Sequence, residues 1–527
     1  MNISIFFVWL VFCFCGSFIL FMMYGIIYFV FLDWMFFSFK FNFYMNSMFF
    51  SFVLFLVTLS VLLFSTYYME GEANLVYFML IFMVFVVSMF FLNFSSGVFS
   101  MLFSWDILGV SSFFLVLFYN NWDSCSGAMN TVLTNRIGDF FIFLFFVGFV
   151  FSSLSFFSVV FSVSLTVLLV LVAGFTKSAQ FPFSGWLPKA MSAPTPVSAL
   201  VHSSTLVTAG LILIMGFSVL SLGVNMSFLV GFVGLVTMVF SSVCALLEQD
   251  MKKVVALSTL SQMGFSMLTL GLGLYFVSLL HLVSHALFKS CLFIQVGIFI
   301  HSFFSQQDVR NYNSLGSLCY FVQLQMIVTL FCLCGLLFTS GSVTKDMILE
   351  FFFVNVWSFC FGMIFFLGVF LTFIYSYRLF MGLVCSFNFS LLNVHVSLMM
   401  GLFSSVLVLF SVVGLWWLSV NVLTVPVLFL YVDVYVPLFY VVGVLVLIYM
   451  IVKFVFMGVK YGFLVDYLAK YYCYFNFVGS YVDMFVGKVL MDFVNLGGCF
   501  GMVMVGMFKN LGMSVVVLVL FFFFIVV

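Results

Sequence analysis

Several ionisable side chains in this sequence stand inside long apolar runs, where they could carry protons or ions. Between residues 172 and 210 an apolar run holds Lys177 and is followed by four of the chain's six prolines, after which a renewed apolar segment carries His202. A charge at membrane depth is costly unless it is paired or hydrated, so it indicates an ion pathway. A break in a spanning helix is tolerated only where protein or a wet cavity covers the freed carbonyls, so we predict a broken helix that lines such a pathway. The prolines expected to break it are Pro182, Pro194 and Pro196.

A second apolar segment carries His281, His285 and Lys289 at positions i, i+4 and i+8. This spacing places the three side chains on one face of a helix. Because His changes charge near neutral pH, three titratable groups in line predict a proton relay. Zinc binding by the two histidines is the alternative, since i, i+4 is also a ligand spacing, but no H-E-x-x-H motif and no nearby thiolate supports it.

Asp106 is a lone carboxylate in an apolar run, with no basic residue within one helical turn. It is either protonated or paired with a cation from another helix, and Lys177 is the candidate partner. We expect movement or protonation of Asp106 to favour proton release from Lys177, with His202 across a hydrated cavity. The alternative is a static ion pair that holds two helices together.

Three further charged clusters accompany the apolar runs. Arg136 and Asp139 are three residues apart on one predicted helix and can pair locally. Lys253 belongs to a cluster of charges between two apolar runs. A solvated loop and helix start is the simple explanation of this cluster, and a role of Lys253 in transport is the alternative. Lys345 and Asp346 open a half-helix after a second interruption, where they are suited to proton exchange unless they form a pair at the water interface.

Composition decides the protein class. Of the residues, 66% are hydrophobic and 6% are charged, against about 25% charged in soluble domains. The chain is therefore predicted to be a polytopic membrane protein. Its zero net charge gives no reason to expect nucleic acid as a partner. The 12 cysteines have no C-x-x-C spacing and are expected to be small buried residues, and no loop is long enough for a nucleotide, flavin or haem domain.

Spanning helices need about 20 apolar residues, and this length predicts about fourteen crossings before residue 460. The expected segments are 3–28, 47–67, 74–95, 97–119, 129–152, 158–180, the half-helix 183–191, 197–218, 226–247, 254–274, 276–301, the interrupted run 319–357, 358–384, 397–419 and 437–457. Breaks are expected near 181–183 and 338–343. Two broken helices with comparable lysines are typical of an internally repeated transporter.

The C-terminal part differs from the rest. Sparse charges interrupt every apolar run in residues 460–510, and this length exceeds one crossing if it is helical. It is either a polar hairpin or a long amphipathic helix that lies along the membrane or against partner subunits. Residues 511–527 are expected to form a final short span.

Six motifs, in this order, resemble one known family. They are TNRIGD, GFTKSAQFPFSGWLPKAMSAPTPVSALVHSSTLVTAG, QDMKKVVALSTLSQMG, HLVSHALFK, QDVRN and SGSVTKD. They are similar to the mitochondrially encoded chain 5 family of NADH:ubiquinone oxidoreductase (respiratory complex I), itself similar to Mrp-type cation/proton antiporters. The resemblance implies an all-α fold of about 15 transmembrane helices with two inverted five-helix repeats. The implied divisions are N-terminal helices in 1–96, an antiporter-like core in 97–385, additional helices in 386–459, a lateral amphipathic helix in 460–510 and an anchor in 511–527.

The same resemblance implies a proton-translocating subunit in the mitochondrial inner membrane. Partner subunits of the membrane arm would assemble with it, with lipids such as cardiolipin as further candidates, while NADH, FMN, iron–sulfur clusters and quinone would be bound elsewhere in the complex. No cofactor, metal or redox centre is expected in this chain. Asp106 stands where the family commonly has Glu. The relay residues implied are Asp106, Asp139, Lys177, His202, Lys253, His281, His285, Lys289, Lys345 and Asp346.

Two other functions are consistent with the residues alone. A stand-alone sodium/proton antiporter would share the core, although it has no use for a surface-lying C-terminal helix. A scaffold that transports nothing would hold the same charges as static pairs.

Overall fold

The computed structural model describes part of the chain, namely residues 27–33, 38–152, 159–216, 224–303, 305–311, 320–335, 339–341, 344, 345, 347, 348, 359–384 and 398–414. These residues all belong to one contact unit, Met1–Val465, and a second unit, Asp466–Val527, lies outside the described residues. The predictions for the first span up to residue 26, for 437–457, for the lateral helix and for the final anchor therefore also lie outside them.

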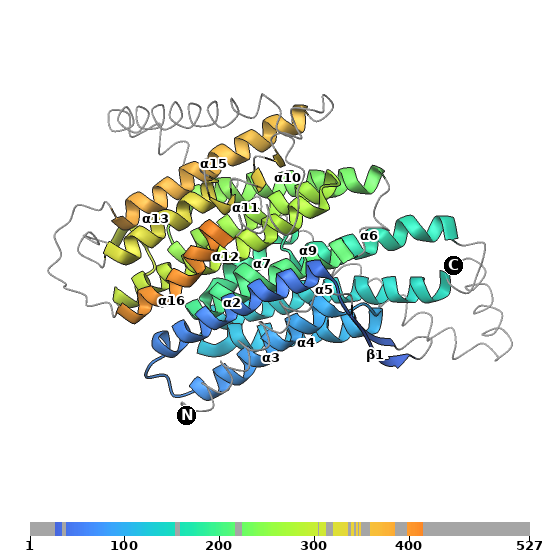
Figure 1. The fold of residues 1–527 in the computed structure, drawn as a ribbon, viewed down its shortest axis with the longest axis horizontal. Coiled ribbons are helices and arrows are strands. Elements are labelled where there is room, and N and C mark those ends of the chain that lie inside the picture. Colours follow the sequence, from blue (N-terminus) through green and yellow to red (C-terminus); the bar gives the residue numbers. More distant parts are fainter. Residues whose placement is uncertain are drawn as a thin grey trace, which may run out of the picture. The chain divides into compact units, whose positions relative to one another are not determined.

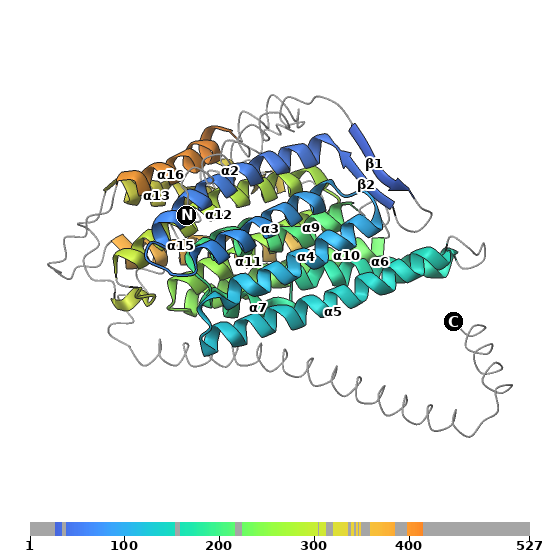
Figure 2. The same ribbon diagram turned by 90° about the horizontal axis from the view of Figure 1, so that it is seen from below.

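Eight helical segments of the described chain are long and apolar enough to cross a membrane. They are α2 (Met45–Tyr68), α3 (Leu75–Phe94), α4 (Val98–Val116), α5 (Trp122–Ser152), the segment Thr195–Gly216, α10 (Val224–Leu247), α11 (Met251–Gly271) and α12 (Tyr275–Ser302). Four further helices accompany them: α6 (Val159–Lys177), α13 (Tyr320–Cys334), α15 (Phe359–Val384) and α16 (Leu398–Leu409), which the π-helical η8 (Phe410–Gly414) continues. The helices run alongside one another in both views (Figure 1, Figure 2). This arrangement confirms the predicted class of multi-pass helical membrane protein.

Two of the more polar spanning helices, α11 and α12, lie innermost, whereas α5, the least apolar of the eight, is the least buried. The spanning parts of α11 and α12 are almost wholly buried, although α11 carries buried polar residues such as Ser258, Thr259 and Gln262. By contrast α3, the most apolar of them, is less than half buried. In a lipid environment polar side chains gain by facing protein and not hydrocarbon, so the helices that carry the predicted relay are drawn to the centre.

One element departs from the all-α prediction. Residues Ile27–Asp33 (β1) and Ser38–Phe43 (β2) form an antiparallel pair in which Val30 lies opposite Lys40. The end of the predicted first span, 27–28, thus belongs to a strand. In β2, phenylalanines alternate with Lys40 and Asn42, and this period of two favours a strand.

The first predicted break is confirmed. Helix α6 ends at Lys177, and the chain then continues in short pieces through the cis peptide bond between Phe181 and Pro182. Pro194 precedes α8 and Pro196 lies in its first turn, where the missing N–H costs nothing. The pieces are η2 (Phe183–Gly185), α7 (Trp186–Lys189), η3 (Ala190–Ser192), α8 (Thr195–Val197), the π-helical η4 (Ser198–Thr205) and α9 (Leu206–Gly216).

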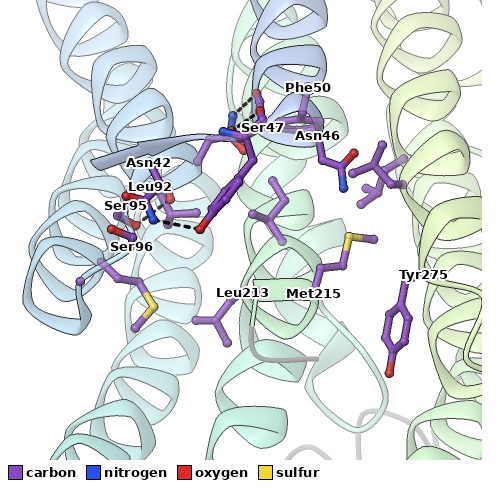
Figure 3. Close-up of a pocket in the computed structure, with 18 of the residues that line it drawn as sticks. Asn42, Asn46, Ser47, Phe50, Leu92, Ser95, Ser96, Leu213, Met215 and Tyr275 are labelled. Carbon is purple, nitrogen blue, oxygen red and sulfur yellow. Dashed lines mark hydrogen bonds between the residues drawn. The ribbon is translucent and has the colours of Figure 1, made fainter. Parts of the chain in front are cut away.

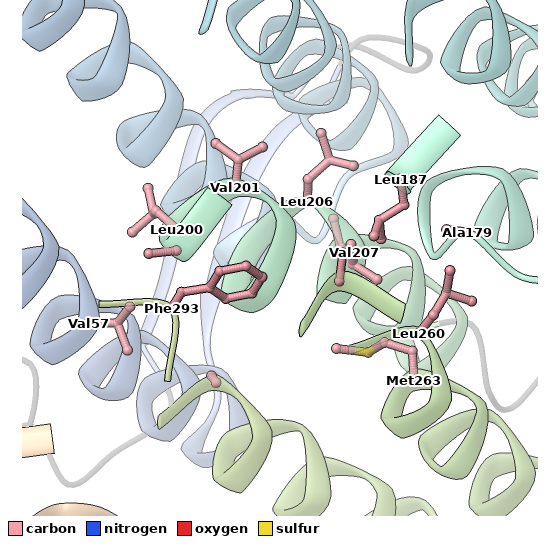
Figure 4. Close-up of a cluster of buried hydrophobic side chains, with 14 of the residues drawn as sticks. Val57, Ala179, Leu187, Leu200, Val201, Leu206, Val207, Leu260, Met263 and Phe293 are labelled. Atoms are coloured by element: carbon pink, nitrogen blue, oxygen red, sulfur yellow. The ribbon is translucent and has the colours of Figure 1, made fainter. Parts of the chain in front are cut away.

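Apolar side chains surround the broken segment. Buried residues of α2, α7, η4, α9, α11 and α12 meet there, as Figure 4 shows. Close backbone contact also holds it in place, because a Cβ on Gly210 of α9 would collide with Gly174 and Ser178 at the end of α6. The end of α6 therefore has a fixed position.

The second break begins earlier than predicted. Helix α13 ends at Cys334, and not near Phe338, because Gly335 follows with φ of +77°. A glycine in this left-handed conformation is the common residue just after a helix end. The chain is helical again at Ser340 and Gly341 and at Thr344 and Lys345.

Candidate functional site

Lys177 is completely buried at the last residue of α6. Its Nζ donates a hydrogen bond of 2.7 Å to the backbone carbonyl of Trp105 on α4 and lies 3.7 Å from the centre of the Trp105 ring. The indole N–H of Trp105 in turn donates to Asp139 Oδ1 of α5 at 2.8 Å. Three helices thus meet at one tryptophan, a residue that the sequence analysis did not single out.

Asp106 does not pair with Lys177 as predicted. Its carboxylate lies 3.6 Å from Arg136 of α5, and no described ion pair joins it to Lys177. Adjacent residues on a helix point about 100° apart, so a helix that turns Trp105 towards Lys177 turns Asp106 towards α5. The predicted local pair of Arg136 and Asp139 is confirmed at 3.2 Å.

His202 is buried in η4. Neither of its ring nitrogens has a hydrogen-bond partner among the described residues. Its ring centre is 6.1 Å from that of Trp186, whose indole N–H donates to the carbonyl of Thr176 at 3.0 Å. Since Thr176 directly precedes Lys177, Trp186 connects the imidazole with the end of α6.

The predicted relay residues of α12 are all buried on this one continuous helix: they are His281, His285 and Lys289. His281 Nδ1 lies 3.0 Å from Thr344 Oγ1, and Lys289 donates to Ser258 Oγ of α11. Both ring nitrogens of His285 lack a protein partner in the described part of the chain. The spacing i, i+4, i+8 therefore holds in the structure, and each group faces neutral polar atoms or none.

Lys345 is buried as well, and its Nζ donates to the carbonyls of Leu333 and Cys334 at 2.7 and 3.1 Å. These carbonyls end α13, where a helix has unsatisfied acceptors and the negative end of its dipole. The ammonium also lies 5.3 Å from the centre of the Phe265 ring. Lys345 was predicted at a helix start that disfavours its charge, but the contacts with α13 favour the charge. Asp346 lies outside the described residues.

Lys253, which was predicted as a central relay residue, does not belong to this buried set. Its side chain is 42% exposed and lies 2.6 Å from Asp250 at the start of α11. Its neighbour Lys252 is buried and donates to the carbonyl of Ala193, at the broken segment, at 3.3 Å. Two adjacent lysines carry no local signal that tells the buried one from the exposed one.

Two pockets lie at the ends of helices. A charged one of about 580 Å³ is lined by residues that include Lys253 and Asp250. The other, of about 670 Å³, lies where α2, α4 and α12 begin and is lined by uncharged polar and apolar residues (Figure 3). Of the predicted relay residues that the structure describes, only Lys253 lines either of these two pockets.

Comparison with known proteins finds relatives that match this chain over nearly its whole length. The family described as NADH:quinone oxidoreductase/Mrp antiporter, TM, matches residues 95–374. NADH-ubiquinone oxidoreductase chain 5 of Ascaris suum is 56% identical over 99% of this chain and 96% of its own length. The protein of that name from Caenorhabditis elegans is 55% identical over 99% of both chains.

Solved structures of respiratory and antiporter complexes share the fold. A chain of the Mrp complex from a Dietzia species has a TM-score of 0.68 at 24% identity, covering 77% of this chain and 46% of its own. A chain of the membrane-bound sulfane sulfur reductase, an archaeal respiratory membrane complex, has a TM-score of 0.67 at 20% identity, covering 76% and 70%. With relatives this similar over the full length, the chain belongs to the NADH-ubiquinone oxidoreductase chain 5 family, as its six motifs predicted.

Proposed function

We propose that this chain is a proton-translocating membrane-arm subunit of NADH:ubiquinone oxidoreductase, placed in the mitochondrial inner membrane. The observation that carries the proposal is the way the buried lysines are held. Lys177, Lys252 and Lys289 donate to carbonyl or hydroxyl oxygens, and within the described residues none of them has a carboxylate within 4 Å.

This kind of contact suits proton exchange. A lysine in a direct buried ion pair is held charged, and removing its proton would leave an unpaired carboxylate. A lysine held only by neutral acceptors can release its proton without leaving such a charge behind. The static pairs that a scaffold would need are therefore not what these three lysines make.

The proposed route joins the two breaks. It leads from Lys177 past His202 and Lys252 to His281, His285 and Lys289, and ends at Lys345. Thr344 connects α12 with the end of this route, because its hydroxyl contacts His281 while its neighbour Lys345 contacts the end of α13. Lysines 289 and 345 also repel each other, so that a proton on one favours release from the other.

Partner subunits are proposed from an exposed ion pair. Asp106 lies midway along α4 and Arg136 midway along α5, and their side chains are 39% and 55% exposed. A charged pair facing hydrocarbon at this depth is costly. We therefore infer that another membrane-arm subunit covers this face, which a stand-alone antiporter would leave in lipid. NADH, FMN, iron–sulfur clusters and quinone would be bound by partner subunits, with lipids such as cardiolipin as further contacts.

The finer architecture is part of the same proposal. We infer about 15 transmembrane helices in two inverted five-helix repeats, with a lateral helix in 460–510 and an anchor in 511–527. Support comes from the two broken helices, since each break lies beside a buried lysine, Lys177 in one case and Lys345 in the other.

The proposal is tested by changing Lys177 and Lys345 to Met in the assembled complex. Methionine has a similar volume but carries no proton, so we expect proton pumping per NADH oxidised to fall about tenfold or more while the complex still assembles. Pumping would be measured in sealed vesicles and assembly by native electrophoresis with NADH dehydrogenase staining. Full pumping in both variants, or a native chain that does not migrate with NADH dehydrogenase activity, would exclude this function.

A further inference from the structure

We propose that Trp105 is a positioning residue that couples the protonation of Asp139 to the charge of Lys177. The inference rests on the proposed function, because it assigns a role within the same proton path. In place of a direct ion pair between a carboxylate and Lys177, the side chain of Trp105 joins Asp139 to Lys177.

The contacts of Trp105 are made by three different parts of the residue. Its carbonyl accepts from Lys177, its ring faces the Lys177 ammonium, and its indole N–H donates to Asp139. The side chain is 1% exposed, so each contact lies in a dry environment where it is stronger than in water. A ring face over an ammonium and a carbonyl oxygen both favour the charged form of Lys177.

The neighbouring backbone brings the two ends of this link close together. A Cβ on Gly138 would collide with Thr176 Oγ1, so α5 and α6 touch at these two residues. Gly138 precedes Asp139 and Thr176 precedes Lys177. The carboxylate and the ammonium thus come from two helices that are in close contact, and yet the indole contacts both of them.

Among the described residues, the helices packed on α6 bring no other charged group to act on Lys177. The groups that act on Lys177 are Asp139, Asp106 and Arg136. Helix α9 and the short η2 carry no titratable residue, and α10 carries only Cys244 near its far end. Arg136 is paired with both Asp106 and Asp139.

The link works as a relay of position and charge. While Asp139 is ionised, its charge holds the indole N–H and keeps the ring against Lys177. When Asp139 takes up a proton, this bond weakens, the ring moves from the ammonium, and Lys177 releases a proton towards His202. One proton is gained and one is lost, so the net charge of the buried cluster stays the same.

The experiment compares Trp105→Leu and Trp105→Phe in the assembled complex, with Trp122→Phe as a control because Trp122 is 92% exposed. Leucine removes the ring and the donor, so Lys177 should lose its proton more easily. Pumping per NADH oxidised should then fail, as pH rises, about one pH unit earlier than in the unchanged protein. Phenylalanine keeps a ring and should shift this limit less, and Trp122→Phe should not shift it. An unchanged limit in Trp105→Leu would overturn the proposal.

A double-mutant cycle tests the contact between Trp105 and Asp139, and it keeps the proposal testable if Trp105→Leu does not assemble. Trp105→Phe removes the indole donor and Asp139→Asn removes the negative charge that the donor contacts, so both break the same link and the double variant should pump no worse than the weaker single variant. Losses that multiply would mean that the two residues act independently, which contradicts the link.

Lys177→Met separates the proposed role of Trp105 from the proposed function of the chain. If it stops pumping while the Trp105 variants behave normally, only the role of Trp105 is lost. If Lys177→Met and Lys345→Met both pump normally, the proposed function is lost as well.

Discussion

At the scale of single residues, one position along a helix separates a buried lysine from an exposed one. Lys252 is 3% exposed and reaches the carbonyl of Ala193, whereas Lys253 is 42% exposed and pairs with Asp250. Burying an ammonium costs free energy, and the same helix start offers a solvated position one residue later. We therefore expect the buried Lys252 to have a use for its proton.

This contrast makes a prediction with a built-in control. Lys252→Met should lower proton pumping about tenfold or more, because it removes a protonatable group from the buried row. Lys253→Met should leave pumping close to normal and weaken only a partly exposed ion pair, worth about 0–1 kcal/mol. Pumping per NADH oxidised would be measured for both variants at equal amounts of assembled complex. The reverse order of effects would return Lys253 to the relay.

At the scale of elements, the position of the α6 end depends on glycine packing. Gly210 of α9 touches Gly174 and Ser178 so closely that no side chain fits between them. In membranes such close contacts between small residues replace the hydrophobic driving force that packs soluble helices. The fixed crossing of α6 and α9 is what holds Lys177 in reach of Trp105.

Gly210→Ala should therefore destabilise the fold by about 1–3 kcal/mol through overpacking. Gly216→Ala, on the same helix, is the matched control because a Cβ there meets nothing within 4 Å. The temperature at which the assembled complex loses its band in native electrophoresis should fall for the first variant and stay close to normal for the second. Equal behaviour of the two would show that the crossing tolerates a methyl group.

At the scale of the whole molecule, the exposed pair of Asp106 and Arg136 marks a face of the unit Met1–Val465 that needs a protein neighbour. The surrounding surface of α4 and α5 is apolar, with large exposed side chains such as Leu133 and Phe140, and therefore fits either lipid or protein. Only the charges distinguish the two, because hydrocarbon cannot solvate them.

Arg136→Gln should reduce the amount of assembled complex, since it leaves Asp106 and Asp139 without their shared cation at the interface. Adding Asp106→Asn should restore part of it by removing one of the two stranded charges. Glu72→Gln, in an exposed turn, should have no effect. Native electrophoresis of solubilised membranes measures all three. Normal assembly of Arg136→Gln would place lipid, and not a subunit, on this face.

Local physics was enough for much of this protein. Apolar runs of sufficient length predicted the spanning helices, because lipid requires each such segment to satisfy its own backbone. Prolines predicted the first break within a few residues, since they cannot donate to a helix. Helical spacing placed His281, His285 and Lys289 on one face before any packing was known, and the order of six motifs identified the family.

Only the tertiary structure decided which charge meets which. It placed Trp105 between Lys177 and Asp139, gave Asp106 to Arg136, and chose Lys252 over Lys253. The reason is rotation about the helix axis: a helix that is apolar all round has no pattern that tells its inner face from its outer one, and a turn of about 100° exchanges neighbouring residues. That angle is set by the helices packed against it, not by its own residues.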